Sequence, residues 1–338
     1  MIVGTFDLLT RASVDIRRGS FYIGLIVLGT VAPVVLLAWG LQVAAAGLSD
    51  AEIAAVLRGP STAWLGGASL LAVAGALVAI VESRSLAVAL VGARLEGRPL
   101  QVRDGVQRSR MVFWHVVAAT LLISGPLTLI QYALAGWLTT VFHGVTEVTT
   151  FSAAIVAAIL GTPFAYVTAG IVLGDVGAIE ATRRSIRLFA VRRRSALVVS
   201  LFAFAAQLLT GIGLGSGLDL VLRVFDALGL GSTSGDVGVA ITSALIVIIV
   251  FAFGTLLFTV TAIAAAPQVL MFLALTHATP GLAKVRALGT GRRQPVQVGW
   301  GAGPPPIRWR FRWLTRPMLL AIVIGALMAA GGLASLNR

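Results

Sequence analysis

The sequence predicts an all-α, polytopic integral membrane protein. Of its 338 residues, 58% are hydrophobic and only 12% are charged, and the mean hydropathy is +0.96. Soluble domains carry about a quarter charged residues, so this chain lacks the polar surface that a water-soluble globule needs. Apolar runs of about eighteen residues or more recur along the chain, which is typical of transmembrane helices.

Seven transmembrane helices are predicted, at roughly 21–46, 64–92, 112–138, 151–174, 196–217, 239–275 and 318–336. Six or eight spans are alternatives, mainly because the sixth segment is so long. The predicted organisation is a cytoplasmic amphipathic helix at 1–20, a six-helix membrane domain at 21–276, a basic Gly- and Pro-rich cytoplasmic loop at 277–317, and a seventh transmembrane helix at 318–338.

Basic residues alternate along the chain in a way that predicts its orientation. Segments 1–20, 94–110, 179–195 and 277–317 hold 22 of the 26 lysines and arginines, whereas segments 47–63, 139–150 and 218–238 and the tail after 336 hold three. Cytoplasmic loops of membrane proteins are enriched in Lys and Arg. We therefore expect a cytoplasmic (plasma) membrane protein with its N-terminus in the cytoplasm and its C-terminus outside. The net charge of +13 then needs no nucleic-acid partner.

One local pattern precedes the first, third and fifth predicted spans: an acid, an arginine four residues later, and a small residue. Its members are Asp7-Arg11-Ala12, Asp104-Arg108-Ser109 and Glu180-Arg184-Ser185. On a helix, the acid and the arginine share a face and can pair. Apolar residues fall on another face, namely Val102, Val106 and Phe113, then Ile179, Ile186 and Phe189. Such helices lie in the membrane surface, which predicts three loose repeats of a basic amphipathic surface helix plus a helical hairpin.

Three segments built on this pattern resemble a known family. They are TFDLLTRASVDIRRGS (5–20), VRDGVQRSRMVFWHV (102–116) and GDVGAIEATRRSIRLF (174–189). They resemble the membrane domain attached to some glycerophosphodiester phosphodiesterases, over roughly residues 5–280. In that family the phosphodiesterase activity belongs to a separate soluble barrel domain. The resemblance therefore implies a stand-alone membrane domain without the catalytic barrel, and it implies no phosphodiesterase activity.

The returning helices of the three predicted hairpins each contain a candidate interruption, at Glu82-Ser83-Arg84, at Gly161-Thr162-Pro163 and at Pro267-Gln268. Charge within a span is costly and tends to be paired and functional. Glu82 and Arg84 are therefore the sharpest polar candidates, with Gln268 and Asp175 as possible partners. The alternative is that Glu82 and Arg84 lie at the cytoplasmic interface, with the arginine side chain reaching the headgroups.

Two basic segments are predicted to bind lipid headgroups or a partner protein. The first is the surface-helix set, with candidates Arg108, Glu180, Arg183, Arg184 and Arg187. The second is the end of the 277–317 loop, where basic and aromatic side chains alternate immediately before a span, with candidates Arg308, Trp309, Arg310, Arg312 and Trp313. Both patterns are typical of contacts with anionic headgroups at the cytoplasmic face.

No catalytic constellation is predicted. The chain has no cysteine, and its three histidines are isolated in the sequence, so we predict no metal site and no cofactor. Three function classes follow: a non-enzymatic scaffold or partner-binding subunit at the cytoplasmic face, a transporter or permease subunit for a lipid or amphipathic solute, and, least favoured, a membrane enzyme of lipid metabolism. The expected partners are the lipid bilayer and either another protein or a second copy of the chain.

Overall fold

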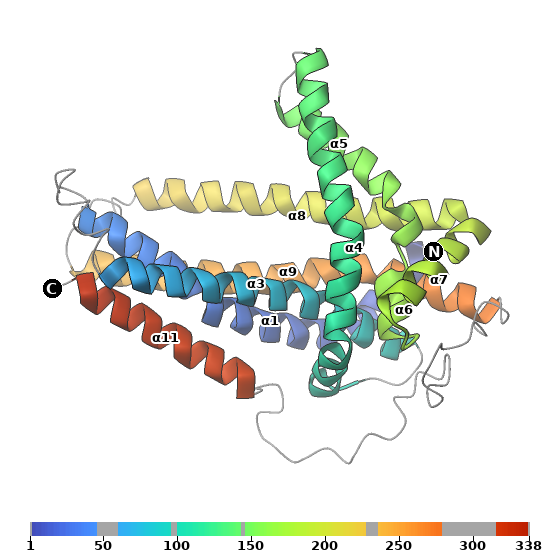
Figure 1. Cartoon of the computed structure of the whole chain (residues 1–338). Helices are drawn as coiled ribbons and strands as arrows, with labels where there is room; N and C mark the ends of the chain where they lie inside the picture. Colours follow the sequence, from blue (N-terminus) through green and yellow to red (C-terminus); the bar gives the residue numbers. More distant parts are fainter. Residues whose placement is uncertain are drawn as a thin grey trace. The chain divides into compact units, whose positions relative to one another are not determined.

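The computed structural model describes residues 2–45, 60–95, 100–142, 146–227, 236–278 and 316–336. Within these ranges every regular element is a helix, as predicted (Figure 1). In chain order the elements are α1 (Ile2–Ala45), α3 (Pro60–Leu95), α4 (Val102–Phe142), α5 (Thr146–Leu160), the 3₁₀-helix η1 (Thr162–Phe164), α6 (Val167–Val172), α7 (Ala178–Val191), α8 (Arg193–Ala227), α9 (Asp236–Ala278) and α11 (Arg316–Leu336).

Five of the described helices are long and apolar enough to cross a membrane: α1, α3, α4, α8 and α9. A sixth crossing is formed if α5 and the η1–α6 segment, which are bent by 49° relative to each other, act as one span. The predicted seventh span coincides with α11, of which the stretch Ile322–Gly331 qualifies only as a shorter apolar helix. The all-helical class is therefore confirmed, with five or six helices that could cross a membrane, and the count of seven spans and the three repeats stay predictions.

One of the three predicted interruptions is present. After α5 ends at Leu160, the chain turns through Gly161 and continues as η1, which has Pro163 in its first turn. Proline has no N–H to donate to the preceding helical turn, which weakens a helix at that point without always interrupting it. By contrast, α3 is continuous through Glu82 and Arg84, and α9 is continuous through Pro267.

The surface helices predicted before the first and third spans are not separate elements. α1 runs without interruption from Ile2 to Ala45, so no helix end occurs at residue 20. α4 likewise includes both the predicted surface segment and the span. Only α7 is a separate helix, because Arg192, at φ −139° and ψ 70°, leaves the helical conformation before α8 begins. A 44-residue helix such as α1 is about 66 Å long, roughly twice the hydrocarbon thickness.

The chain packs as two compact units. Unit 1 comprises Met1–Ile16, Val81–Thr210 and Val260–Arg308, and unit 2 comprises Arg17–Ile80, Gly211–Thr259 and Trp309–Arg338. Within unit 2, helices approach closely at small residues. A Cβ atom on Gly325 of α11 would overlap the carbonyl oxygen of Gly29, and one on Gly75 of α3 would overlap Oγ1 of Thr30. Small residues permit such backbone contacts between membrane helices.

Unit 1 is organised around the second half of α3. From Val81 to Ala93 every residue except Arg84 is buried. α4 crosses this segment, and a Cβ atom on Gly105 would lie 2.7 Å from Cδ1 of Leu86. α4 and α5 form a hairpin, while α6 packs against both α4 and α7 (Figure 1). A helix that is buried on all sides must find protein partners for its polar groups.

Candidate functional site

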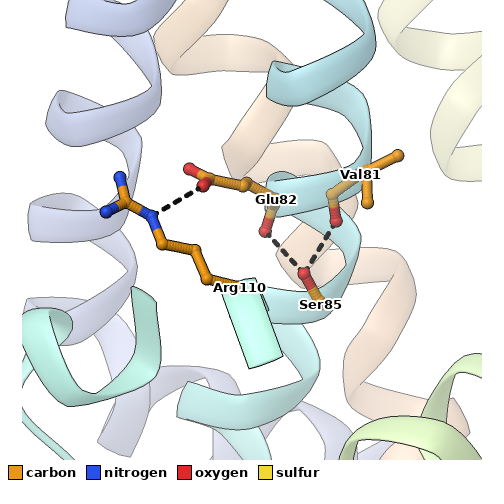
Figure 2. Close-up of polar contacts among 4 residues, drawn as sticks. All are labelled: Val81, Glu82, Ser85 and Arg110. Atoms are coloured by element: carbon orange, nitrogen blue, oxygen red, sulfur yellow. Dashed lines mark hydrogen bonds and ion pairs between the residues drawn. The ribbon is translucent and has the colours of Figure 1, made fainter. Parts of the chain in front are cut away.

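The single acid of α3 is Glu82, whose side chain is 4% exposed. Its carboxylate Oε1 lies 3.4 Å from Nε of Arg110 on α4, as Figure 2 shows. Arg110 itself is 39% exposed, so the pair joins a buried acid to a base that reaches the surface of the unit. One of the two sequence predictions was a partner for Glu82, with Gln268 and Asp175 as the possible partners, and Arg110 was not among them. Arg84 is half-buried in α3, and Gln268 is half-buried in α9.

A second ion pair ties the start of α1 to the end of α3. Nε of Arg94 donates a hydrogen bond to Oδ2 of Asp15, whose side chain is 6% exposed. Sequence reasoning missed this pair, because Asp15 follows the acid of the repeated pattern and its partner lies 79 residues away. The sequence feature that could have indicated the pair is the position of Asp15 on the same helix face as Ala12 and Ile16, which are also buried. An acid on an apolar face needs a partner.

Arg108 holds the connection between α6 and α7. Its Nε and Nη2 atoms donate to the carbonyl oxygen of Val172 at 3.1 and 2.8 Å, and Nη2 lies 2.8 Å from Oδ1 of Asp175. Val172 is the last residue of α6, where carbonyl groups lack partners within the helix and attract cations. Asp175 has a positive φ of 50°, which a short polar side chain tolerates best. Arg108, which the sequence predicted to bind headgroups or a partner, therefore binds the α6–α7 connection of its own chain.

The third member of the repeated pattern forms the predicted pair. Nε of Arg184 lies 3.3 Å from Oε1 of Glu180 one turn earlier, and both side chains are largely buried. Asp7 and Arg11 pair in the same way at 2.7 Å on the exposed start of α1. The inner face of α7 also carries Ser185, whose Oγ accepts from the N–H of Tyr166 and donates to the carbonyl oxygen of Pro163.

The outer face of α7 is both apolar and basic. Ile179 is 64% exposed and Ile186 is 44% exposed, and Arg183 and Arg187 are exposed beside them. The arginines at the α7–α8 junction, Arg192, Arg193 and Arg194, are exposed as well. In the part of the chain that the structure describes, these five arginines form no ion pair. The surface made by these five arginines, Ile179 and Ile186 is called the α7 face below.

The start of α4 differs from α7 although its sequence pattern is the same. Val102 and Val106 are buried in unit 1 instead of forming an outward apolar stripe. The reason is the close contact of Gly105 with Leu86, which places that side of α4 against α3. The candidates of the basic loop, Arg308, Trp309, Arg310, Arg312 and Trp313, lie outside the described residues.

The described residues contain no group of three or more His, Cys, Asp or Glu side chains that could hold a metal ion. No protein-family model, no curated protein and no solved structure matches the chain. The resemblance to the membrane domain of glycerophosphodiester phosphodiesterases therefore stays a prediction. What the described residues bring together is a set of cross-helix ion pairs inside unit 1 and a basic, apolar α7 face on its surface.

Proposed function

We propose that this protein is a multi-pass membrane protein without catalytic activity, which acts as a scaffold or partner-binding subunit at the cytoplasmic face of a bacterial plasma membrane. The observation that supports the proposal is the division of arginines on α7. Arg184 is buried against Glu180, whereas Arg183 and Arg187 are exposed beside Ile179 and Ile186. A surface with both features suits the boundary between headgroups and acyl chains.

The charge of the α7 face favours anionic partners. Each basic residue near an anionic membrane surface contributes about 1 kcal/mol of attraction. The same charge favours an orientation with α7 and the N-terminus in the cytoplasm and the C-terminus outside. We therefore propose that the α7 face binds anionic lipid headgroups. We also propose that the scaffold binds a partner protein or a second copy of the chain.

The test is to extract the full chain in native-lipid particles and to identify by mass spectrometry the lipids and proteins that accompany it. Arg183→Glu with Arg187→Glu should reduce the enrichment of anionic lipid or of a stoichiometric protein several-fold. Arg183→Lys with Arg187→Lys keeps the charge and is the matched control, which should retain the enrichment. If the Glu variant is produced normally and keeps every lipid and protein of the wild type, the α7 face has no such role.

A second candidate function is a transporter or permease subunit for a lipid or amphipathic solute. It is favoured by the Glu82–Arg110 pair, because charged residues buried between membrane helices commonly mark substrate or ion pathways. For this function, the native-lipid particles should contain one enriched lipid and no stoichiometric protein, and Glu82→Gln should remove that enrichment. An unchanged lipid profile in Glu82→Gln would count against transport.

A further inference from the structure

The outward side of α4 carries large apolar side chains along most of its length. Leu121 is 69% exposed and Leu129 is 72% exposed. Between residues 115 and 136 the sequence has no Asp, Glu, Lys or Arg. A helix that faces water carries charged and polar residues on its outer side, whereas exposed apolar patches mark contacts with membranes or other proteins. This part of α4 therefore needs apolar surroundings.

Two exposed tryptophans mark the ends of this stretch. Trp114 is 75% exposed and Trp137 is 56% exposed. Residues 114 and 137 are 23 positions apart, which is about 35 Å along a helix. The hydrocarbon core of a bilayer is about 30 Å thick, and tryptophans are enriched at both of its interfaces. Length, composition and end residues therefore fit a lipid bilayer around this part of α4, with Trp114 at one interface.

The turn before Trp114 adds a basic residue to the exposed side. Met111 is 64% exposed, and Arg110, the partner of Glu82, is 39% exposed. A guanidinium carries five N–H donors, so its contact with Glu82 through Nε is compatible with contacts to a phosphate group. Aromatic and basic side chains at the end of an apolar stretch are typical of the headgroup layer. The surface made by Arg110, Met111 and Trp114 is called the α4 face below.

The α4 face is close to the start of α7. His115 follows Trp114 directly, and a Cβ atom on Gly177 would lie 3.5 Å from Cδ2 of His115. Gly177 is the N-terminal cap of α7, and Ile179 of the α7 face follows two residues later. Arg108 of α4 also binds the α6–α7 connection. The α4 face and the start of the α7 face therefore lie in the same region of unit 1.

We propose that the α4 face is a second membrane contact, which binds anionic phospholipid headgroups at the same interface as the α7 face. The proposal deepens the proposed function and rests on it for the choice of the cytoplasmic side, whereas the depth of the α4 face is independent of it. One consequence concerns Glu82. Because Arg110 precedes Trp114 by about one turn, the Glu82–Arg110 pair lies at the headgroup layer and not at the centre of the bilayer.

Fluorescence quenching in reconstituted bilayers tests the depth of the α4 face. Because the chain has no cysteine, Trp114→Cys, Leu129→Cys and Ile179→Cys each provide a single site for a fluorophore. A nitroxide in the lipid headgroup should quench the labels at positions 114 and 179 more strongly than a nitroxide near the end of the acyl chain. The label at position 129 should show the reverse order, because it is about 12 Å along the helix from Trp137, the nearer of the two tryptophans.

The same variants test the charge of the headgroup. The label at position 114 should be quenched more strongly by nitroxide-labelled phosphatidylglycerol than by nitroxide-labelled phosphatidylcholine, because the exposed arginines attract the anionic lipid. The label at position 129 is the matched control. It should be quenched equally by both lipids, since it lies in the charge-free stretch. Equal quenching by both lipids at position 114 would overturn the choice of an anionic lipid.

Equal depths at positions 114 and 129 would overturn the proposal, because α4 would then lie along the bilayer plane. A label in water at position 114, with that at position 179 among the headgroups, would overturn the α4 face and leave the proposed function intact. The converse result would support the α4 face and contradict the α7 face. If Trp114→Cys is not produced, Met111→Cys takes its place, because it lies three residues earlier on the same side of the helix.

Discussion

At the scale of single residues, three acids of unit 1 are paired with arginines from elsewhere in the chain, and two of these acids, Asp15 and Glu82, are buried. Asp15 forms an ion pair with Arg94, Glu82 with Arg110, and Asp175 with Arg108. A carboxylate removed from water must be paired or protonated, because its desolvation cost exceeds what packing returns. These pairs join α1 to α3, α3 to α4, and α4 to the α6–α7 connection.

The Glu82–Arg110 pair gives a stability prediction. Arg110→Met should lower the free energy of unfolding by about 1–3 kcal/mol, less than the loss for a fully buried pair because Arg110 is partly exposed. Glu82→Gln should cost less, because it leaves no buried charge. The double variant Glu82→Gln with Arg110→Met should recover part of the loss. Reversible unfolding in mixed micelles measures all three, and a double variant as unstable as the sum of the singles would contradict the pairing.

Close backbone contact in unit 2 gives a second residue-scale prediction. A methyl group on Gly75 would overlap Thr30, whose hydroxyl is held by the carbonyl oxygen of Ile26 at 2.8 Å. Gly75→Ala should therefore lower the free energy of unfolding by about 1–3 kcal/mol. Gly66→Ala on the same helix is the control, because no atom lies within 4 Å of the added Cβ. Equal effects of the two substitutions would contradict the contact.

At the scale of elements, α7 is positioned by one of its own side chains and by one side chain of α4. Ser185 anchors it to the turn after α5, and Arg108 of α4 clamps the α6–α7 connection through Val172 and Asp175. A planar guanidinium can serve a carbonyl and a carboxylate at once, whereas a lysine ammonium is a single point charge. The α7 face therefore belongs to a helix whose position is fixed by hydrogen bonds and an ion pair.

Arg108→Lys should loosen the α6–α7 connection by about 1–2 kcal/mol. Amide hydrogens at the start of α7 should then exchange about tenfold faster, while those in the buried half of α3 should keep their rates. Hydrogen exchange with mass spectrometry measures both regions in one experiment. Arg103→Lys, a half-buried position on the same helix, is the control. Unchanged exchange in α7 would show that Arg108 does not hold it.

At the scale of the whole molecule, the sequence was sufficient for helix positions but not for helix contacts. Each predicted span coincides with a described helix or broken helix pair except at two ends: residue 46 lies outside the described residues, and 173–174 follow the end of α6. Apolar length is a local property, which is why the sequence alone predicts it. The interruption at Gly161–Pro163 and the Glu180–Arg184 pair were also predictable, since both depend on neighbours within a turn. The partner of Glu82 lies 28 residues away and is chosen by the crossing of α3 and α4, which no local pattern encodes.

Packing also explains why the repeated acid–arginine pattern accompanies a buried apolar face on α4 and an exposed one on α7. The apolar face at Val102 and Val106 is buried because α3 covers it, whereas Ile179 and Ile186 of α7 remain exposed. Periodicity predicts that a helix has an apolar side, but only packing decides whether protein or lipid covers that side. The sequence predicts that α7 is amphipathic, but only the structure shows that Ile179 and Ile186 are exposed.

The central proposal is that the α7 face lies at the cytoplasmic membrane surface. Because the chain has no cysteine, Arg187→Cys places a single thiol there without further changes. A membrane-impermeant maleimide should label this thiol in inside-out vesicles and leave it unlabelled in intact spheroplasts. Labelling from the outer side, or no labelling from either side until the protein is denatured, would contradict the account.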